Sequence, residues 1–245
     1  MAKRKSAKKT STSSGTHIER VRSGIPGLDK LIEGGFVKSS TILITGATGT
    51  GKTTFCAQFI REGLKKGEPG VYITMEEDPE DIREDIKRYG FNFEKYENDG
   101  TFKFVYHNPF EISDITSTIV DVINSVNAKR VVLDPVSLLG MYMKDTAVLR
   151  KRLFEIIRLL RKTSATTLIT SEIKEDEKGL SRFGVGEFIV DAVIVLHYLN
   201  IGKQSFGNLQ IRKMRRTKHE HGWFPINITS SGLEVSEEEA STVLK

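Results

Sequence analysis

Residues 41–54, which read TILITGATGTGKTT, constrain the fold of this chain more than any other stretch. A short apolar run leads into Gly46 and then into Gly51, Lys52 and Thr53, so every fixed position of the phosphate-loop pattern G-x-x-x-x-G-K-[ST] is filled. The glycines allow positive φ and bring backbone N–H groups against phosphate oxygens, while the positive end of the following helix faces the same anion. The stretch therefore predicts a strand, a phosphate-binding loop and a helix in direct succession.

The loop also predicts individual roles. Lys52 is expected to reach the β and γ phosphates of a nucleoside triphosphate, and the hydroxyl of Thr53 is expected to bind Mg²⁺. The alternative is a glycine-rich turn that binds nothing, which the flanking strand and helix disfavour. The candidate nucleotide-binding residues are Thr48, Gly49, Thr50, Gly51, Lys52, Thr53 and Thr54.

Size and composition indicate one large α/β domain, since the chain has 245 residues, of which 38% are hydrophobic and 28% charged. It contains neither a membrane-length apolar run nor an apolar N-terminal signal core, so we expect a cytoplasmic protein without membrane association. The single cysteine, Cys56, has no partner for an intramolecular disulfide and is expected to be a small buried packing residue.

The net charge of +5 is concentrated in the N-terminal tail. Residues 1–16 contain five lysines and arginines and no acidic residue, so the rest of the chain is neutral. A neutral body disfavours a broad nucleic-acid-binding face. The tail is expected to be a disordered solvated extension, with contact to nucleic acid or acidic partners as the alternative. Residues 17–235 then form the domain, and residues 236–245 form a C-terminal tail.

The pattern of apolar runs predicts alternating strands and helices up to residue 170. This alternation favours a largely parallel sheet with helices on both faces, followed by an antiparallel C-terminal extension. Asp78 is predicted to cap a helix that has Pro79 at its first position. A loop is expected at 174–186 and a turn at 202–207. The predicted helices are 55–66, 79–89, 113–126 and 146–162, and the predicted strands are 42–45, 71–75, 101–106, 130–133, 166–170, 192–198, 209–214 and 226–229.

Carboxylates follow several of these strands, at the edge of the sheet where the phosphate loop also lies. Asp134 ends a buried strand, which is the form of a Walker B element that holds Mg²⁺. Glu76 and Glu77 end the strand after the phosphate-loop helix, where one can act as base for an attacking water while its neighbour raises its pKa. We assign Glu76 as the base and Glu77 as its partner; two solvated capping acids before Pro79 are the alternative. Glu172 ends a further strand.

A basic segment, KMRRTKH at 213–219, is the third chemical feature. On a strand, Lys213 and Arg215 fall on the same face. Because helices cover the sheet of this chain, the phosphates of a neighbouring subunit are a plausible target, and a nucleic-acid contact or a solvated strand are the alternatives. His219 and His221 lack a third ligand nearby, which disfavours a metal site.

These motifs resemble those of the KaiC family within the RecA-like P-loop ATPases, over about residues 17–235. The resemblance rests on SGIPGLDKLIEGG, the phosphate loop, TMEEDPEDI, VVLDPVSLL, SRFGVGEFIVDAVIVL and KMRRTKH followed by ITSSGLEV.

The resemblance implies a RecA-like core that binds ATP and Mg²⁺ and assembles into homo-oligomeric rings, with a hexamer favoured and a smaller ring as the alternative. It also implies that Lys213, Arg215, Thr217 and His219 reach the ATP of the neighbouring subunit, and that Thr229 and Ser230 approach the nucleotide. The chain departs from the family in having Gly186 where an acidic residue is frequent and Arg216 where glycine is common. Clock proteins of the family carry two such domains in tandem, whereas this chain has one.

The leading hypothesis is an ATPase that hydrolyses ATP slowly as a homo-oligomer and signals its nucleotide state to a protein partner. A RecA/RadB-like DNA-handling ATPase would explain the basic tail, and predicts stimulation by single-stranded DNA with a steep salt dependence. A nucleotide-binding interaction module with little turnover is a further alternative. A kinase acting on its own serine or threonine is disfavoured.

Overall fold

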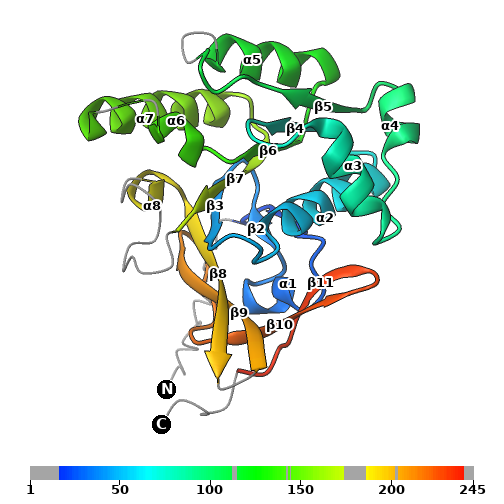
Figure 1. The fold of residues 1–245 in the computed structure, drawn as a ribbon, viewed down its shortest axis with the longest axis vertical. Helices are drawn as coiled ribbons and strands as arrows, with labels where there is room; N and C mark the ends of the chain where they lie inside the picture. Colours follow the sequence, from blue (N-terminus) through cyan, green and yellow to red (C-terminus); the bar gives the residue numbers. More distant parts are fainter. Residues whose placement is uncertain are drawn as a thin grey trace, which may run out of the picture.

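A computed structural model of the chain describes residues 17–111, 115–141, 143, 145–173, 186–201 and 204–239. Its centre is a nine-stranded sheet in the order β11-β10-β9-β8-β3-β7-β6-β4-β5 (Figure 1). The strands are β3 (Thr41–Gly46), β4 (Gly70–Thr74), β5 (Phe102–Tyr106), β6 (Arg130–Asp134), β7 (Thr166–Glu172), β8 (Ala192–Ile201), β9 (Gln204–Met214), β10 (Phe224–Thr229) and β11 (Gly232–Val235).

The direction of the strands divides this sheet into two parts. The strands from β8 to β5 run parallel to one another, with β3 between β7 and β8. From β8 onward, β9, β10 and β11 pair antiparallel. The predicted fold class, a mostly parallel sheet with an antiparallel C-terminal extension, is confirmed.

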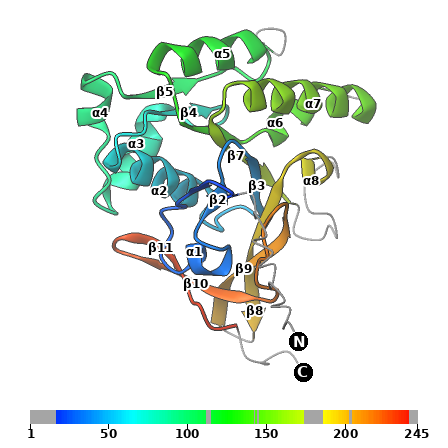
Figure 2. The same ribbon diagram turned by 180° about the vertical axis from the view of Figure 1, so that it is seen from behind.

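Helices cover both faces of the sheet, and each face has its own apolar core (Figures 1 and 2). One face carries α1 (Leu28–Leu31), α2 (Lys52–Lys65), α3 (Pro79–Lys87) and α4 (Glu94–Asn98), and the other carries α5 (Ile115–Val126), α6 (Ser137–Met141), α7 (Thr146–Lys162) and α8 (Gly186–Ile189). Because strand side chains alternate, Ile42 and Ile44 of β3 enter the first core while Leu43 enters the second. Cys56 is fully buried in the first core, as predicted.

Most predicted elements are present, with shifted ends. Helix α2 begins at Lys52 rather than at residue 55, because Gly51 adopts a left-handed conformation and starts the helix directly after the loop. The cap at Asp78 is confirmed, since its side chain accepts a hydrogen bond from the backbone N–H of Glu80 at 2.9 Å. Helix α7 has the predicted ends.

Other predictions need correction. The turn expected at 202–207 is too long, because Gln204 already pairs with Ile201 and Gly207 with Tyr198 in the β8–β9 hairpin. Strand β11 and the small sheet of β1 (Arg20–Val21) and β2 (Phe36–Val37) were not predicted. Both tails, at 1–16 and 240–245, and most of the expected loop, 174–185, lie outside the described residues. Among the described helices, none has both the length and the apolar character needed to cross a membrane.

Candidate functional site

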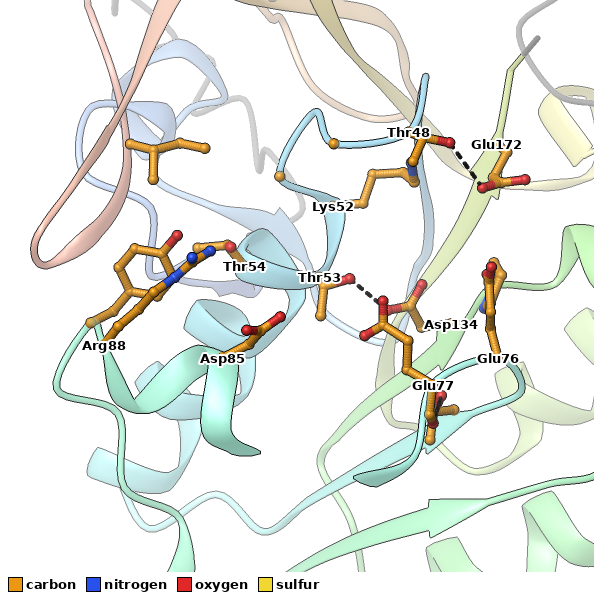
Figure 3. A pocket seen from close by; sticks show the side chains of 16 residues that line it. Thr48, Lys52, Thr53, Thr54, Glu76, Glu77, Asp85, Arg88, Asp134 and Glu172 are labelled. Carbon is orange, nitrogen blue, oxygen red and sulfur yellow. Dashed lines mark hydrogen bonds between the residues drawn. The ribbon is translucent and has the colours of Figure 1, made fainter. Parts of the chain in front are cut away.

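A cavity of about 340 Å³ lies at the carboxyl ends of the central parallel strands, beside the phosphate loop, α3 and the β10–β11 hairpin (Figure 3). Residues from six separate parts of the chain line this cavity. The lining residues are Thr48, Gly49, Gly51, Lys52, Thr53, Thr54, Thr74, Glu76, Glu77, Asp85, Arg88, Tyr89, Asp134, Pro135, Glu172 and Ile228.

Two glycines give the phosphate loop its shape. Gly49 has φ of 79° and Gly51 has φ of 92°, in the region that side-chain-bearing residues avoid. Thr50 does not line the cavity with its side chain, because its hydroxyl donates to the carbonyl oxygen of Ala47 at 2.8 Å and closes the loop from behind. The remaining loop residues that the sequence predicts to bind nucleotide, from Thr48 to Thr54, all line the cavity.

Lys52 crosses the loop from the first turn of α2. Its ammonium group donates to the carbonyl oxygens of Gly46 at 3.1 Å and Ala47 at 2.9 Å. Burial lowers the pKa of Lys52, and the negative charges of Asp134, Glu172 and Glu76 oppose that shift. The residue therefore presents a cation in the part of the cavity where three carboxylates converge.

Asp134 lies at the end of β6, opposite the helix start, and its side chain is mostly buried. The hydroxyl of Thr53 donates to its Oδ2 at 3.4 Å. A hydroxyl beside a carboxylate is a set of hard oxygen ligands of the kind that Mg²⁺ prefers. The two residues predicted to hold the metal thus fit that role.

The two adjacent glutamates occupy different positions. In Figure 3 the Glu77 side chain points toward Thr53 and Asp134, while Glu76 lies farther along, on the side of Glu172. Partial withdrawal from water, followed by the charges of Asp134 and Glu76, raises the pKa of Glu77 above its ordinary value. Glu76 lies close enough to Lys52 to act on its charge.

The other end of the cavity is formed by residues that the sequence analysis did not single out. Asp85, Arg88 and Tyr89 come from α3 and the turn after it, and the Arg88 guanidinium lies 4.8 Å from the centre of the Tyr89 ring. Ile228 of β10 also lines the cavity and belongs to the β10–β11 hairpin. The signal available in the sequence was the i, i+3 spacing of Asp85 and Arg88, which places both on one side of a helix.

Buried Gln58 of α2 holds that hairpin in place. Its amide donates to the carbonyl oxygen of Leu233 at 2.9 Å and accepts from the Leu233 N–H at 2.6 Å. The helix that begins at the phosphate loop is thereby tied to the hairpin that carries Ile228. The position of one end of the cavity depends on the position of the other.

The predicted basic residues do not line this cavity. Lys213 donates to the carbonyl oxygens of Glu187 at 3.0 Å and Val190 at 2.7 Å. Arg215 lies 3.8 Å from the carboxylate of Asp191, so both cations approach the same short segment.

The other residues predicted to act between subunits also lie outside the cavity lining. Thr217 accepts a hydrogen bond from Arg20 at 3.0 Å, and the His219 ring lies 3.0 Å from the carbonyl oxygen of Glu220. Thr229 is next to the lining residue Ile228, and its hydroxyl donates to the carbonyl oxygen of Gly232. In the described part of the chain, the cationic residues of 213–219 therefore do not line the cavity that contains the phosphate loop.

Comparison with known proteins gives a consistent result. The family model described as "ATPase: KaiC" matches residues 21–240. The chain is 35% identical to UPF0273 protein MK0039 of Methanopyrus kandleri, across 90% of this chain and 93% of that protein. It is 32% identical to circadian clock protein KaiC3 of Synechocystis, across 86% of this chain but only 44% of that protein. The crystal structure of the KaiC-like protein PH0186 from Pyrococcus horikoshii is 40% identical, with a TM-score of 0.83 over 89% of this chain and 99% of that one.

Proposed function

The chain belongs to the KaiC family of ATPases, and on that basis we propose that it binds ATP with Mg²⁺ and hydrolyses it slowly as a homo-oligomer. The observation that carries the proposal is a single cavity that holds the phosphate loop, Asp134 and the glutamate pair. These are the parts that hydrolysis of a phosphoanhydride requires: a phosphate cradle, a metal ligand and a base.

The cavity has a direction that suits a nucleotide. We place the triphosphate along the loop from Gly49 to Thr53, with its γ phosphate toward the carboxylates that line the cavity. We place the adenine ring at the opposite end of the cavity, near Arg88 and Ile228. A guanidinium plane and an apolar side chain there suit an aromatic ring. Thr53 and Asp134 would hold Mg²⁺, which supplies positive charge to the β and γ phosphate oxygens when bound.

In the proposed reaction, Glu76 accepts a proton from a water molecule whose oxygen attacks the γ phosphorus. The bond from that phosphorus to the β–γ bridging oxygen breaks, and ADP leaves with the electron pair of that bond. Glu76 is the base in this proposal, and its negative charge lies close enough to Lys52, the proposed γ-phosphate ligand, to oppose the lowering of the lysine pKa, as do the charges of Asp134 and Glu172. Glu77, which faces Thr53 and Asp134, orients the water at the metal side.

A second copy is proposed to complete the site. Lys213, Arg215, Thr217, His219 and Thr229 do not line the cavity of their own chain, so their proposed target is the ATP of the adjacent copy in a ring, with a hexamer favoured. The proposal that nucleotide state is signalled to a protein partner rests on the sequence, which contains the hydrolytic motifs and no recognisable motif for a second small substrate.

Phosphate release from Mg·ATP tests the proposal. Replacing Glu76 and Glu77 together by Gln is expected to reduce turnover by about 10² to 10⁴-fold, the range of general-base assistance. Equilibrium binding of a fluorescent ATP analogue should be unchanged in the same variant. Glu84→Gln is the matched control, because Glu84 is an exposed carboxylate of α3 that does not line the cavity.

The outcomes separate the alternatives. A wild-type protein that binds the analogue but releases no phosphate would be an interaction module rather than an ATPase. Unchanged turnover in the double variant would reject the glutamate assignment. Native mass measured with and without Mg·ATP tests the assembly, and a single copy under all conditions would contradict the ring.

A further inference from the structure

Behind the metal-binding carboxylate lie two hydroxyl groups that the reaction described above does not use. Tyr72 donates a hydrogen bond to Oδ2 of Asp134, and Thr170 donates to Oδ1. Both side chains are buried, at 0% exposure for Tyr72 and 0% for Thr170. Neither residue lines the cavity, so both reach Asp134 from the interior of the sheet.

The register of the sheet brings these groups together. Strand β6 lies between β4 and β7, and Thr74 of β4 pairs with Asp134. Tyr72 is two residues before Thr74 and therefore on the same face, from which the long phenol reaches the carboxylate. On the other side, Ile169 of β7 pairs with Leu133, which places Thr170 next to Asp134.

The hydroxyl of Tyr72 is not needed for packing. The ring lies in the apolar core beside Phe104, with ring centres 5.2 Å apart, where a phenylalanine would pack equally well. Taking a hydroxyl out of water is unfavourable unless it finds a partner. In the described structure the partner of Tyr72 is Asp134. This arrangement points to a role for the hydroxyl at the carboxylate.

Two donors on different oxygens fix the plane of a carboxylate. With Tyr72 on Oδ2 and Thr170 on Oδ1, the Asp134 side chain cannot rotate without breaking both bonds. Oδ2 has two lone pairs and keeps one of them for Thr53, which lies on the cavity side. The carboxylate is thus held in one orientation before any ligand binds.

We propose that Tyr72 is a positioning residue that, together with Thr170, holds Asp134 with Oδ2 toward Thr53 and so sets the affinity of the nucleotide complex for Mg²⁺. This inference rests on the proposed function, since it concerns the metal that accompanies the nucleotide. The side chains that orient a metal ligand contribute about 10 to 100-fold to metal affinity in known sites. Tyr72 acts through Asp134 and does not touch the nucleotide.

The experiment measures how strongly Mg²⁺ promotes nucleotide binding. The dissociation constant of a non-hydrolysable ATP analogue is determined in EDTA and in saturating Mg²⁺. The readout is the ratio of the constant in EDTA to the constant in Mg²⁺. In Tyr72→Phe, which keeps the ring, the ratio should fall about 10-fold or more. The constant in EDTA should be unchanged, because the phosphate loop is intact. Tyr96→Phe is the control, since Tyr96 packs against the same core away from Asp134.

Variants at Thr170 provide a second route if Tyr72→Phe does not fold. Thr170→Val removes the hydroxyl at nearly the same volume and should lower the ratio, whereas Thr170→Ser keeps the hydroxyl and should preserve it. A purely structural role would lower the melting temperature in EDTA and leave the ratio at the wild-type value in folded Tyr72→Phe and Thr170→Val. That result would overturn the inference.

The same data separate this inference from the proposed function. If the wild-type protein does not bind the analogue, the proposed function fails. If it binds the analogue with a strong Mg²⁺ dependence that Tyr72→Phe leaves intact, the inference about Tyr72 fails alone.

Discussion

The phosphate-loop cavity and the basic segment 213–219 are both proposed to take part in ATP hydrolysis, but they are built differently. In the cavity, polar side chains from separate strands and helices contact one another, as Thr53 and Asp134 do, or Thr48 and Glu172. In the basic segment, Lys213 is bound to carbonyl oxygens of its own chain and the Arg215 side chain is 52% exposed. One copy thus assembles the cavity from its own side chains, whereas its basic segment lies outside that cavity.

Charge separates the two regions as well. The cavity gathers carboxylates from the ends of three strands and from α3, whereas the segment at 213–219 contains Lys213, Arg215, Arg216 and Lys218 and no acidic residue. Opposite charge on two separate faces favours a head-to-tail contact between copies, which closes into a ring when the rotation allows. The predictions below test this division, beginning with the largest expected effect.

The largest effect is expected at Arg215. Arg215→Ala should lower ATP turnover by about 10³ to 10⁵-fold, the range for an arginine supplied to a phosphoryl transfer by a neighbour. Mixing this variant with Lys52→Ala copies should restore part of the activity, because a copy with intact Arg215 then stands beside an intact cavity. Phosphate release is the measurement, and Arg158→Ala on the exposed side of α7 is the control. A loss of turnover that mixing does not reverse would contradict a role for Arg215 in the cavity of a neighbouring copy.

The next effect distinguishes the two glutamates. Glu76→Gln alone should reduce single-turnover phosphate release by about 10² to 10⁴-fold, and Glu77→Gln should reduce it less, because Glu77 orients rather than accepts the proton. Rapid-quench measurement on the two single variants decides this point. A larger loss in Glu77→Gln would exchange the roles of the two residues.

A smaller effect is expected at Arg88, at the end of the cavity where we place the adenine ring. Arg88→Ala should weaken ATP binding by about 3 to 10-fold, since a guanidinium over an aromatic ring contributes on the order of 1 kcal/mol. Inorganic tripolyphosphate lacks a base, so its competition constant should not change. Lys87→Ala on the same helix is the control. An equal loss for both ligands would place Arg88 at the phosphates instead.

The smallest effect is a change in titration. Burial, and then the positive charge of Arg215, lowers the pKa of Lys213 below its ordinary value. Arg215→Met removes the like charge and should raise that pKa toward the ordinary value. A ¹³C-methyl NMR titration of reductively methylated protein measures it, with exposed Lys151 as internal reference. If the pKa of Lys213 does not rise, the two cations are not neighbours.

The lowered pKa of Lys213 also affects how the stability of the protein depends on pH. A lysine whose pKa is lowered on folding binds its proton less tightly in the folded state than in the unfolded one. Lys213 therefore reduces the free energy of unfolding, and this reduction is complete at a pH below its lowered folded-state pKa. The reduction shrinks as the pH rises from that pKa toward the ordinary lysine pKa, and it disappears above the ordinary value.

The elements that depend on local sequence were predictable. The phosphate loop requires glycine at particular positions, and Asp78 with Pro79 marks a helix start by chemistry that neighbouring residues supply. Asp134 and the glutamate pair could be placed because carboxyl ends of parallel strands share one edge of the sheet. The KaiC-family assignment made from these motifs is confirmed by the family match over residues 21–240.

The residues that were missed depend on contacts between distant segments. Tyr72 and Thr170 look like ordinary core residues in the sequence, and only the pairing of β4, β6 and β7 brings their hydroxyls to Asp134. Likewise, Ile228 belongs to a hairpin that Gln58 binds across the fold.

By itself the sequence determined the phosphate-binding chemistry, the alternation that makes a parallel sheet, and the family. Those properties follow from backbone conformations and side-chain periods that neighbouring residues set. The tertiary structure alone decided which side chains share the cavity and that the cations of 213–219 lie outside it. Which side chains meet depends on the order and register of the strands. Burial of two apolar cores selects one arrangement of the whole sheet.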